Sequence, residues 1–137
     1  MRTGGCHCGD VRYEVVGDPL YHSLCHCADC RASAGAPAVA WVAFAKGGVR
    51  LTQGSPATYI GTGGAERRFC PRCGTGLLYA NAATIPGVID IQTCTLDEPG
   101  AESGDGPTVQ IQCAEKLAWF DGLAALPAFD RYPVLPE

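Results

Sequence analysis

Residues 6–15 read CHCGDVRYEV, and they hold the two signals that decide the fold. The first signal is a pair of cysteines, Cys6 and Cys8, with a single residue between them. The second follows at once, because apolar and charged side chains alternate over Asp10–Val16 with the period of a half-buried β-strand. This stretch therefore predicts a strand that directly follows a turn bearing two thiols.

Six further segments have the same strand character and are bounded mostly by Gly, Pro or Asn. They are Val39–Phe44, Val49–Gln53, Ala57–Ile60, Gly76–Ala80, Val88–Thr93 and Val109–Cys113. Only Cys27–Ala34 looks helical, over one or two turns, and a three-residue offset would place Cys27 and Cys30 on one helix face. The 18 Gly and 10 Pro residues favour many turns over long helices. We expect an all-β (β-rich) fold with one short helix.

Length, charge and hydropathy exclude several classes of protein. The 137 residues fit one domain, placed at residues 1–137. The net charge is −4 and the longest basic run is Arg67-Arg68, so the electrostatic footprint of a nucleic-acid binder is missing. The longest apolar stretch, Ala38–Ala45, falls far short of the roughly 20 residues that cross a bilayer. With no signal-peptide core either, we expect a cytoplasmic protein with reduced thiols and no membrane or nucleic-acid partner.

The nine cysteines favour metal sites over a disulfide framework, because their number is odd and they are strongly clustered. Seven of them form three motifs: Cys6-x-Cys8, Cys25-x-Cys27-x-x-Cys30 and Cys70-x-x-Cys73-Gly74. A C-x-x-C turn lets two sulfurs converge on one ion at about 2.3 Å.

A structural zinc site takes four tetrahedral ligands, so the economical partition joins the two outer pairs. The closed site would consist of Cys6, Cys8, Cys70 and Cys73. Three thiolates remain for a second zinc whose fourth position is open to water or substrate, as in catalytic zinc sites. These are Cys25, Cys27 and Cys30.

Two other interpretations of the cysteines stay open. A ribbon-type site could join the Cys27–Cys30 pair to the Cys70–Cys73 pair and leave Cys6, Cys8 and Cys25 unassigned. Alternatively, a fourth ligand could close the second site into another structural one. The candidates for that ligand are His22, His26, Cys94 and Cys113.

Three segments resemble the glutathione-dependent formaldehyde-activating enzyme (GFA) or CENP-V-type family. They are Gly5-Cys6-His7-Cys8-Gly9 with the strand after it, Cys25-His26-Cys27-x-x-Cys30-Arg31, and Phe69-Cys70-x-x-Cys73-Gly74-Thr75. The segments Thr95-Leu96-Asp97-Glu98 and Lys116-Leu117-Ala118-Trp119-Phe120 also resemble family signposts, so the likeness spans nearly the whole chain. It implies an Mss4-like fold of folded sheets with zinc-binding turns. It also implies a structural zinc on the outer pairs and an active-site zinc on the three central cysteines, whose open position meets glutathione.

The chain departs from the family pattern at two positions. Gln110 stands where many members carry His, and Cys94 stands where they carry Gly. Neither position is one of the seven expected ligands.

The open three-thiolate site predicts thiol chemistry, because zinc there can bind a further thiolate beside an aldehyde carbon. We expect a zinc-dependent carbon–sulfur lyase or synthase acting on thiol–aldehyde adducts like S-(hydroxymethyl)glutathione. Its cofactors would be two zinc ions per chain, with glutathione as co-substrate and Cys25, Cys27 and Cys30 as the catalytic ligands. Arg31 is the candidate anchor for a glutathione carboxylate, followed by Arg67, Arg68 and Arg72.

Two other functional classes remain, and both depend on residues around the second site. A non-catalytic Mss4-like interaction module would lack the open position. A thiol oxidoreductase such as a methionine sulfoxide reductase would need a reactive cysteine outside the zinc sites, which leaves Cys94 and Cys113. We expect these two to be small core residues. We also expect His26 to point away from the metal, in a supporting or surface role.

Overall fold

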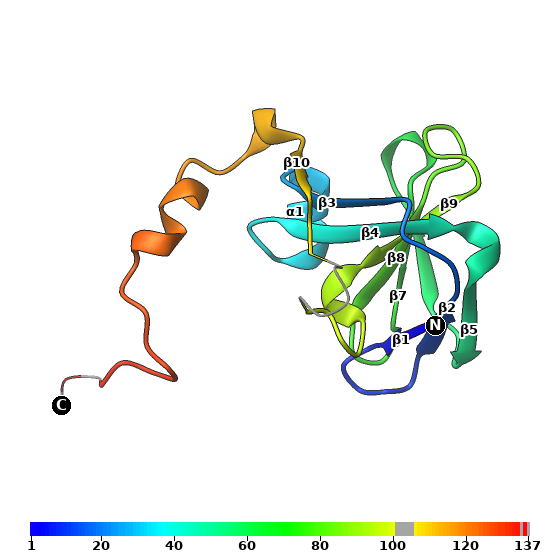
Figure 1. The fold of residues 1–137 in the computed structure, drawn as a ribbon, viewed down its shortest axis with the longest axis horizontal. Coiled ribbons are helices and arrows are strands. Elements are labelled where there is room, and N and C mark those ends of the chain that lie inside the picture. The colour runs from blue at the N-terminus through cyan, green and yellow to red at the C-terminus, as the bar shows by residue number, and fades with distance from the viewer. Residues whose placement is uncertain (101–105, 135, 137) are drawn as a thin grey trace.

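The computed structural model describes residues 1–100, 106–134 and 136, which form ten strands, one α-helix and several 3-10 turns (Figure 1). The strands are β1 (Arg2–Gly5), β2 (Arg12–Val15), β3 (Tyr21–Cys25), β4 (Val39–Ala45), β5 (Val49–Gln53), β6 (Ala57–Ile60), β7 (Glu66–Phe69), β8 (Gly76–Ala80), β9 (Val88–Gln92) and β10 (Val109–Ile111). The helix is α1 (Ala28–Ala34), and the 3-10 turns are η1 (Lys46–Gly48), η2 (Thr62–Gly64), η3 (Thr93–Thr95), η5 (Cys113–Glu115) and η6 (Phe120–Ala125). The prediction of a β-rich fold with one short helix is confirmed.

The strands form two sheets. The smaller has the order β1-β2-β5, and the larger has the order β10-β3-β4-β9-β8-β7-β6. β10 pairs with β3 in parallel, whereas β4 pairs antiparallel with both of its neighbours. The main core includes alternate residues of both sheets, and its largest fully buried side chains include Tyr13, Phe44 and Ile91.

Residues on the other face of the larger sheet form a second, smaller cluster. In β4, Val39 and Trp41 alternate with the core residues Val42 and Phe44 along the strand. Trp41 and Val39 pack with Cys25 and Cys30, so the cysteines of β3 and α1 belong to this cluster. Because side chains of a strand alternate between the two faces of a sheet, the main core lies on one face of the larger sheet and the cluster with Cys25 and Cys30 lies on the other.

Three strands and the positions of two cysteines differ from the expectations. β1, β3 and β7 were not predicted. Cys94 and Cys113 were expected in the core, and this is wrong because both are exposed. The apolar strands β9 and β10 end at Gln92 and Ile111, and each cysteine lies in the 3-10 turn that follows.

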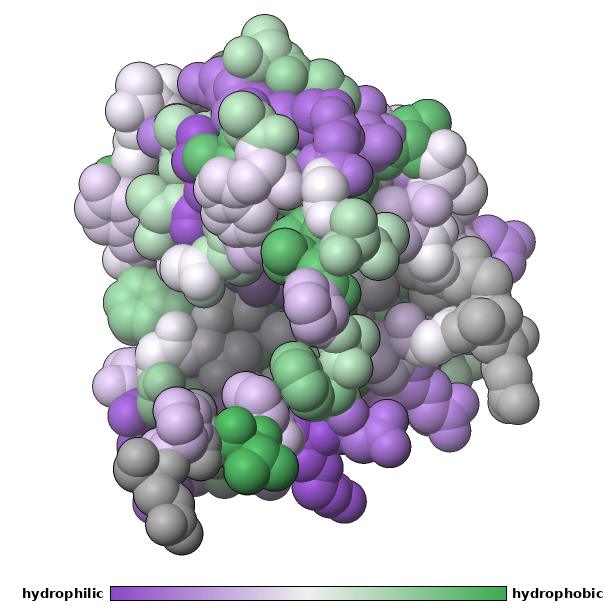
Figure 2. All heavy atoms as spheres, turned by 90° about the vertical axis from the view of Figure 1, so that its left-hand side faces the viewer, coloured by the Kyte–Doolittle hydropathy of each residue, from purple (hydrophilic) through white to green (hydrophobic). Residues whose placement is uncertain are grey.

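The described residues 116–134, here called the C-terminal arm, lead away from the two sheets (Figure 1). The arm carries exposed apolar side chains, including Trp119, Leu126, Phe129 and Tyr132. Seen from that end of the molecule, the surface shows apolar patches between hydrophilic ones (Figure 2). Within the described residues, no helix is long and apolar enough to span a membrane.

Candidate metal centre and cavity

Two turns bring four sulfurs together. Cys6 and Cys8 lie between β1 and β2, and Cys70 and Cys73 lie between β7 and β8. The Sγ atom of Cys8 is 3.6 Å from that of Cys6 and 3.8 Å from that of Cys70. Tetrahedral Zn–S bonds of about 2.3 Å would place sulfurs about 3.8 Å apart. The donor set and spacing of this four-sulfur group therefore fit a zinc ion.

Glycine allows both turns to fold back on their cysteines. Gly9 and Gly74 adopt φ values of +85° and +78°, a region that residues with a Cβ rarely occupy. The Gly74 N–H donates to the Cys70 carbonyl at 2.8 Å, and the Val11 N–H donates to Cys6 Sγ at 3.2 Å. The backbone thus closes the turns and directs N–H groups at sulfur, which stabilises thiolate charge.

The pKa values of the four-sulfur group are split, lowered at Cys6 and Cys73 and raised at Cys8, because thiolate charge on some sulfurs repels further charge on a neighbour. The Thr75 hydroxyl and backbone N–H lower the pKa of Cys73 to about 5. A backbone hydrogen bond from Asp10 lowers the pKa of Cys8, but burial and the neighbouring sulfurs outweigh it and raise that pKa to about 12. A divalent cation would offset this repulsion and favour four thiolates together.

Three further sulfurs converge where β3 meets α1. Cys25 ends β3, Cys27 is the N-cap of α1, and Cys30 is the buried residue of that helix. Their Sγ atoms lie within 4.8 Å of one another, and the Cys30 N–H donates to Cys27 Sγ at 3.2 Å. Among the described residues, no fourth His, Cys, Asp or Glu ligand joins this sulfur triad. The sulfurs are grouped as the economical partition predicts, and not as a ribbon-type site.

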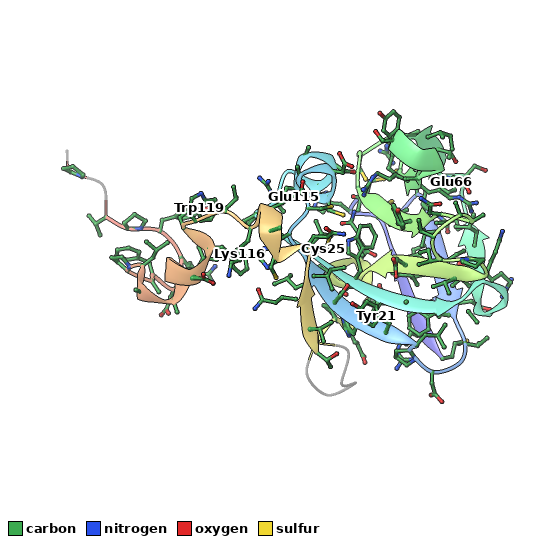
Figure 3. The ribbon with its side chains drawn as sticks, turned by 90° about the horizontal axis from the view of Figure 1, so that it is seen from above. Tyr21, Cys25, Glu66, Glu115, Lys116 and Trp119 are labelled. Carbon is green, nitrogen blue, oxygen red and sulfur yellow. The ribbon has the colours of Figure 1, made fainter. Side chains whose placement is uncertain are left out.

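The sulfur triad lines a cavity of about 440 Å³, which we call the triad cavity. The larger sheet contributes Trp41, Tyr79 and Asp90 to its lining. Glu115 is also a lining residue and lies near Cys25 at the start of the C-terminal arm (Figure 3). An open coordination position would therefore adjoin a space that can receive a small molecule.

Arg67 of β7 connects the sulfur triad to the sheet. Its Nη2 donates to Cys30 Sγ at 3.6 Å, and its guanidinium lies 5.0 Å from the centroid of the Tyr79 ring. The hydrogen bond with Cys25, followed by those with Cys27 and Arg67, lowers the pKa of Cys30 to about 5. The pKa of Cys25 is raised, chiefly by its hydrogen bond with Cys30. Negative charge is thus favoured at the sulfur nearest the guanidinium.

Replacing Arg67 with methionine is expected to weaken metal binding at the triad by about 10- to 100-fold, the usual effect of losing a group that supports a ligand. Methionine provides neither charge nor an N–H for Cys30. Competition with a chromophoric chelator would measure the affinity. Arg68→Met is the matched control, since Arg68 lies 3.7 Å from Glu66 in an ion pair. Equal losses in both variants would contradict a specific role for Arg67.

Arg31, the predicted glutathione anchor, lies outside the lining of the triad cavity. Its Nε donates to the His26 carbonyl at 3.1 Å, and its Nη2 donates to the Glu115 carbonyl at 3.2 Å. It lines a separate groove with Trp119. Arg31 thus fastens α1 to the start of the arm, and Arg67 is the arginine at the cavity.

His26 lies between two triad cysteines in sequence but outside their group in space. It is fully buried, its Nε2 donates to Gln110 Oε1 at 2.7 Å, and its ring packs edge-on against Phe120 at 4.6 Å. His26 thus lies away from the sulfurs, as expected, and of the two roles left open it has the supporting one and not the surface one. Gln110, one of the two departures from the family pattern, is the residue that binds it.

The part of the chain that carries both sulfur groups matches a known family. The family model described as glutathione-dependent formaldehyde-activating enzyme matches residues 1–115. The chain belongs to this family. The match ends where the C-terminal arm begins.

Two relatives and one solved structure are similar to this family member. A protein of Schizosaccharomyces pombe named as an uncharacterized lyase is 29% identical over 70% of this chain and 80% of its own length. A putative glutathione-dependent formaldehyde-activating enzyme of Halomonas elongata is 34% identical over 56% of this chain and about half (54%) of its own length. A crystal structure of a Rhodobacter sphaeroides protein covers 79% of this chain and 98% of that chain, with a TM-score of 0.62 and 23% identity. The last likeness supports the fold alone.

Proposed function

We propose that this protein is a zinc-dependent carbon–sulfur lyase or synthase acting on thiol–aldehyde adducts of the S-(hydroxymethyl)glutathione type. The observation that carries the proposal is the difference between the two sulfur groups. One offers four ligands, whereas the other offers three among the described residues and lines a cavity. Family membership and the names of the two relatives support the same reaction class.

The two groups would hold zinc in different roles. Cys6, Cys8, Cys70 and Cys73 would bind the structural ion, and Cys25, Cys27 and Cys30 would bind the ion at the cavity. When bound there, zinc would supply a Lewis acid that lowers the pKa of a thiol reaching its open position. Arg67 would offset the negative charge of the assembled thiolates, and Trp41 and Tyr79 would shield the reacting atoms from water.

The runner-up is a non-catalytic zinc-binding interaction module. The exposed apolar residues of the C-terminal arm, such as Phe129 and Tyr132, favour this module because exposed apolar surface is typical of protein contacts. The absence of a fourth triad ligand among the described residues favours the enzyme.

Adding reduced glutathione to the cobalt-substituted protein is expected to change the sulfur-to-metal absorption of the triad site, because the incoming thiol completes its ligand set. The protein should also accelerate exchange between formaldehyde and its glutathione adduct above the spontaneous rate. S-methylglutathione, which has no free thiol, is the matched control and should produce neither effect. An unchanged spectrum together with no added exchange would favour the interaction module.

A further inference from the structure

Asp90 is an acidic residue on the half-buried face of β9. Along β9, Ile89 and Ile91 are buried in the main core, whereas Asp90 lines the triad cavity. Its cross-strand partners are Tyr79 on β8 and Ala43 on β4. Cross-strand partners share one face of a sheet, so Asp90 lies on the same face as Tyr79. The carboxyl group is therefore placed on the sheet side of the cavity.

This carboxyl group has no polar partner that fixes it. The Asp90 backbone is part of the sheet, but within the described residues no hydrogen bond or ion pair engages its carboxyl group. Arg67, the nearby cation in the same cross-strand row, instead donates to Cys30 and lies over the Tyr79 ring. Burying an acid without a hydrogen-bond partner costs folding free energy. The position of Asp90 is therefore better explained by a role at the site than by a contribution to stability.

Two other acids line the triad cavity, but their surroundings differ. Asp29 is exposed in the first turn of α1. Glu115 is exposed too, and its Oε2 accepts the Ala28 N–H at 3.4 Å. Asp90 alone among these three lining acids is shielded from water by the sheet.

The surroundings of Asp90 suit an acid that both takes and gives a proton near neutral pH. Burial raises its pKa to about 6, with a smaller contribution from the negative charge of Cys30. The other titratable or charged groups that line the cavity are Tyr79 from β8, Arg67 from β7, Tyr21 from β3, the triad sulfurs, and the two exposed acids Asp29 and Glu115. Acid–base catalysis is most effective when the catalytic pKa lies near the working pH.

The proposed reaction requires such a group. A thiol must lose its proton before its sulfur attacks the carbonyl carbon, and the carbonyl oxygen must gain a proton as the carbon–sulfur bond forms. We propose that Asp90 carries this proton as the acid–base residue of the site. This inference rests on the proposed function.

The step is balanced without any further reactant. The Asp90 carboxylate takes the S–H proton, the sulfur lone pair forms the carbon–sulfur bond, and the C=O π pair moves to oxygen. Protonated Asp90 then returns the proton to that oxygen, which gives the hydroxymethyl thioether. In reverse, Asp90 takes the hydroxyl proton, the carbonyl re-forms, and the carbon–sulfur pair leaves with sulfur.

The test compares wild type, Asp90→Asn and Asp18→Asn in the cobalt-substituted protein. Asparagine keeps the size of the side chain but carries no acid proton. Asp90→Asn should lower formaldehyde exchange by on the order of 100-fold or more, while reduced glutathione still changes the cobalt spectrum. Asp18→Asn, the same substitution at an exposed acid outside the cavity lining, should keep exchange within a few-fold of wild type.

Proton release provides a second measurement that does not depend on turnover. With glutathione and no aldehyde at about pH 6, close to the Asp90 pKa, wild type should release fewer protons per bound thiol than Asp90→Asn, because the charge of the incoming thiolate raises the Asp90 pKa further and Asp90 retains part of the thiol proton. Asp90→Glu should restore retention and part of the exchange, and it replaces the asparagine variant if that variant does not fold. Equal proton release and equal exchange in wild type and Asp90→Asn would overturn the role of Asp90 alone. A wild-type cobalt spectrum unchanged by glutathione would instead overturn the proposed function, and this inference with it.

Discussion

Replacement of Cys70 by serine is expected to leave the chain unfolded or insoluble. Cys70 is fully buried in the main core, and its sulfur belongs to the four-sulfur group that joins two turns far apart in sequence. A structural zinc contributes on the order of 10 kcal/mol to folding, and small domains are stable by only about 5–15 kcal/mol in total. Loss of this one site is therefore comparable with the whole free energy of unfolding. Circular dichroism, the melting temperature and zinc content would measure the loss.

Two companion variants separate ligation from burial. Cys73 is exposed, so Cys73→Ser disturbs little packing, yet it should also unfold the chain because it removes a zinc ligand. Cys94 is exposed and outside both sulfur groups, so Cys94→Ser should melt like wild type. If Cys70→Ser or Cys73→Ser kept the native circular dichroism and melting temperature, the four-sulfur group would not be a structural zinc site.

Most strands could be predicted from the sequence. In β2 and β9 every second residue is buried, so the alternation of the sequence reflects packing on one side of a sheet. β5, β6 and β8 lie where the pattern placed them. The missed strands lack that pattern for specific reasons. β1 (Arg2–Gly5) is half glycine, β3 (Tyr21–Cys25) mixes polar residues with a candidate ligand, and β7 (Glu66–Phe69) is mostly charged. Pairing with neighbouring strands, which single-sequence patterns do not contain, overrides their weak local preference.

The grouping of the seven cysteines could be predicted because ligand count and spacing restrict which thiols share an ion. The residues that surround the sulfur triad could not be predicted in the same way. Arg67 reaches Cys30 only because β7, β8 and β9 pair in a particular register. Asp90 stands between Ile89 and Ile91 in β9, and this was the one local signal of its role. Arg31 adjoins Cys30 in sequence, but the helix directs its guanidinium to the His26 carbonyl, so sequence proximity was misleading there.

The second large effect is expected for Cys27→Ser, which should abolish thiol binding and aldehyde exchange while leaving the fold intact. Cys27 is the N-cap of α1, and its sulfur accepts the Cys30 N–H. Serine is among the preferred N-cap residues, so the helix keeps its cap. A hydroxyl is a poor substitute for thiolate as a zinc ligand, so the triad site loses one of its three ligands.

The expected result is one zinc per chain instead of two, with the native melting curve largely retained. Reduced glutathione should no longer change the cobalt spectrum, and formaldehyde exchange should fall to the spontaneous rate. Mild chelation of wild type should reproduce this state, because an open site exchanges its metal more readily than a closed one. If Cys27→Ser, or mild chelation of wild type, removed both metals and unfolded the chain, both sulfur groups would be structural. The contrast with Cys73→Ser is therefore decisive, since each variant removes one ligand from one group and only the four-sulfur group should be needed for folding.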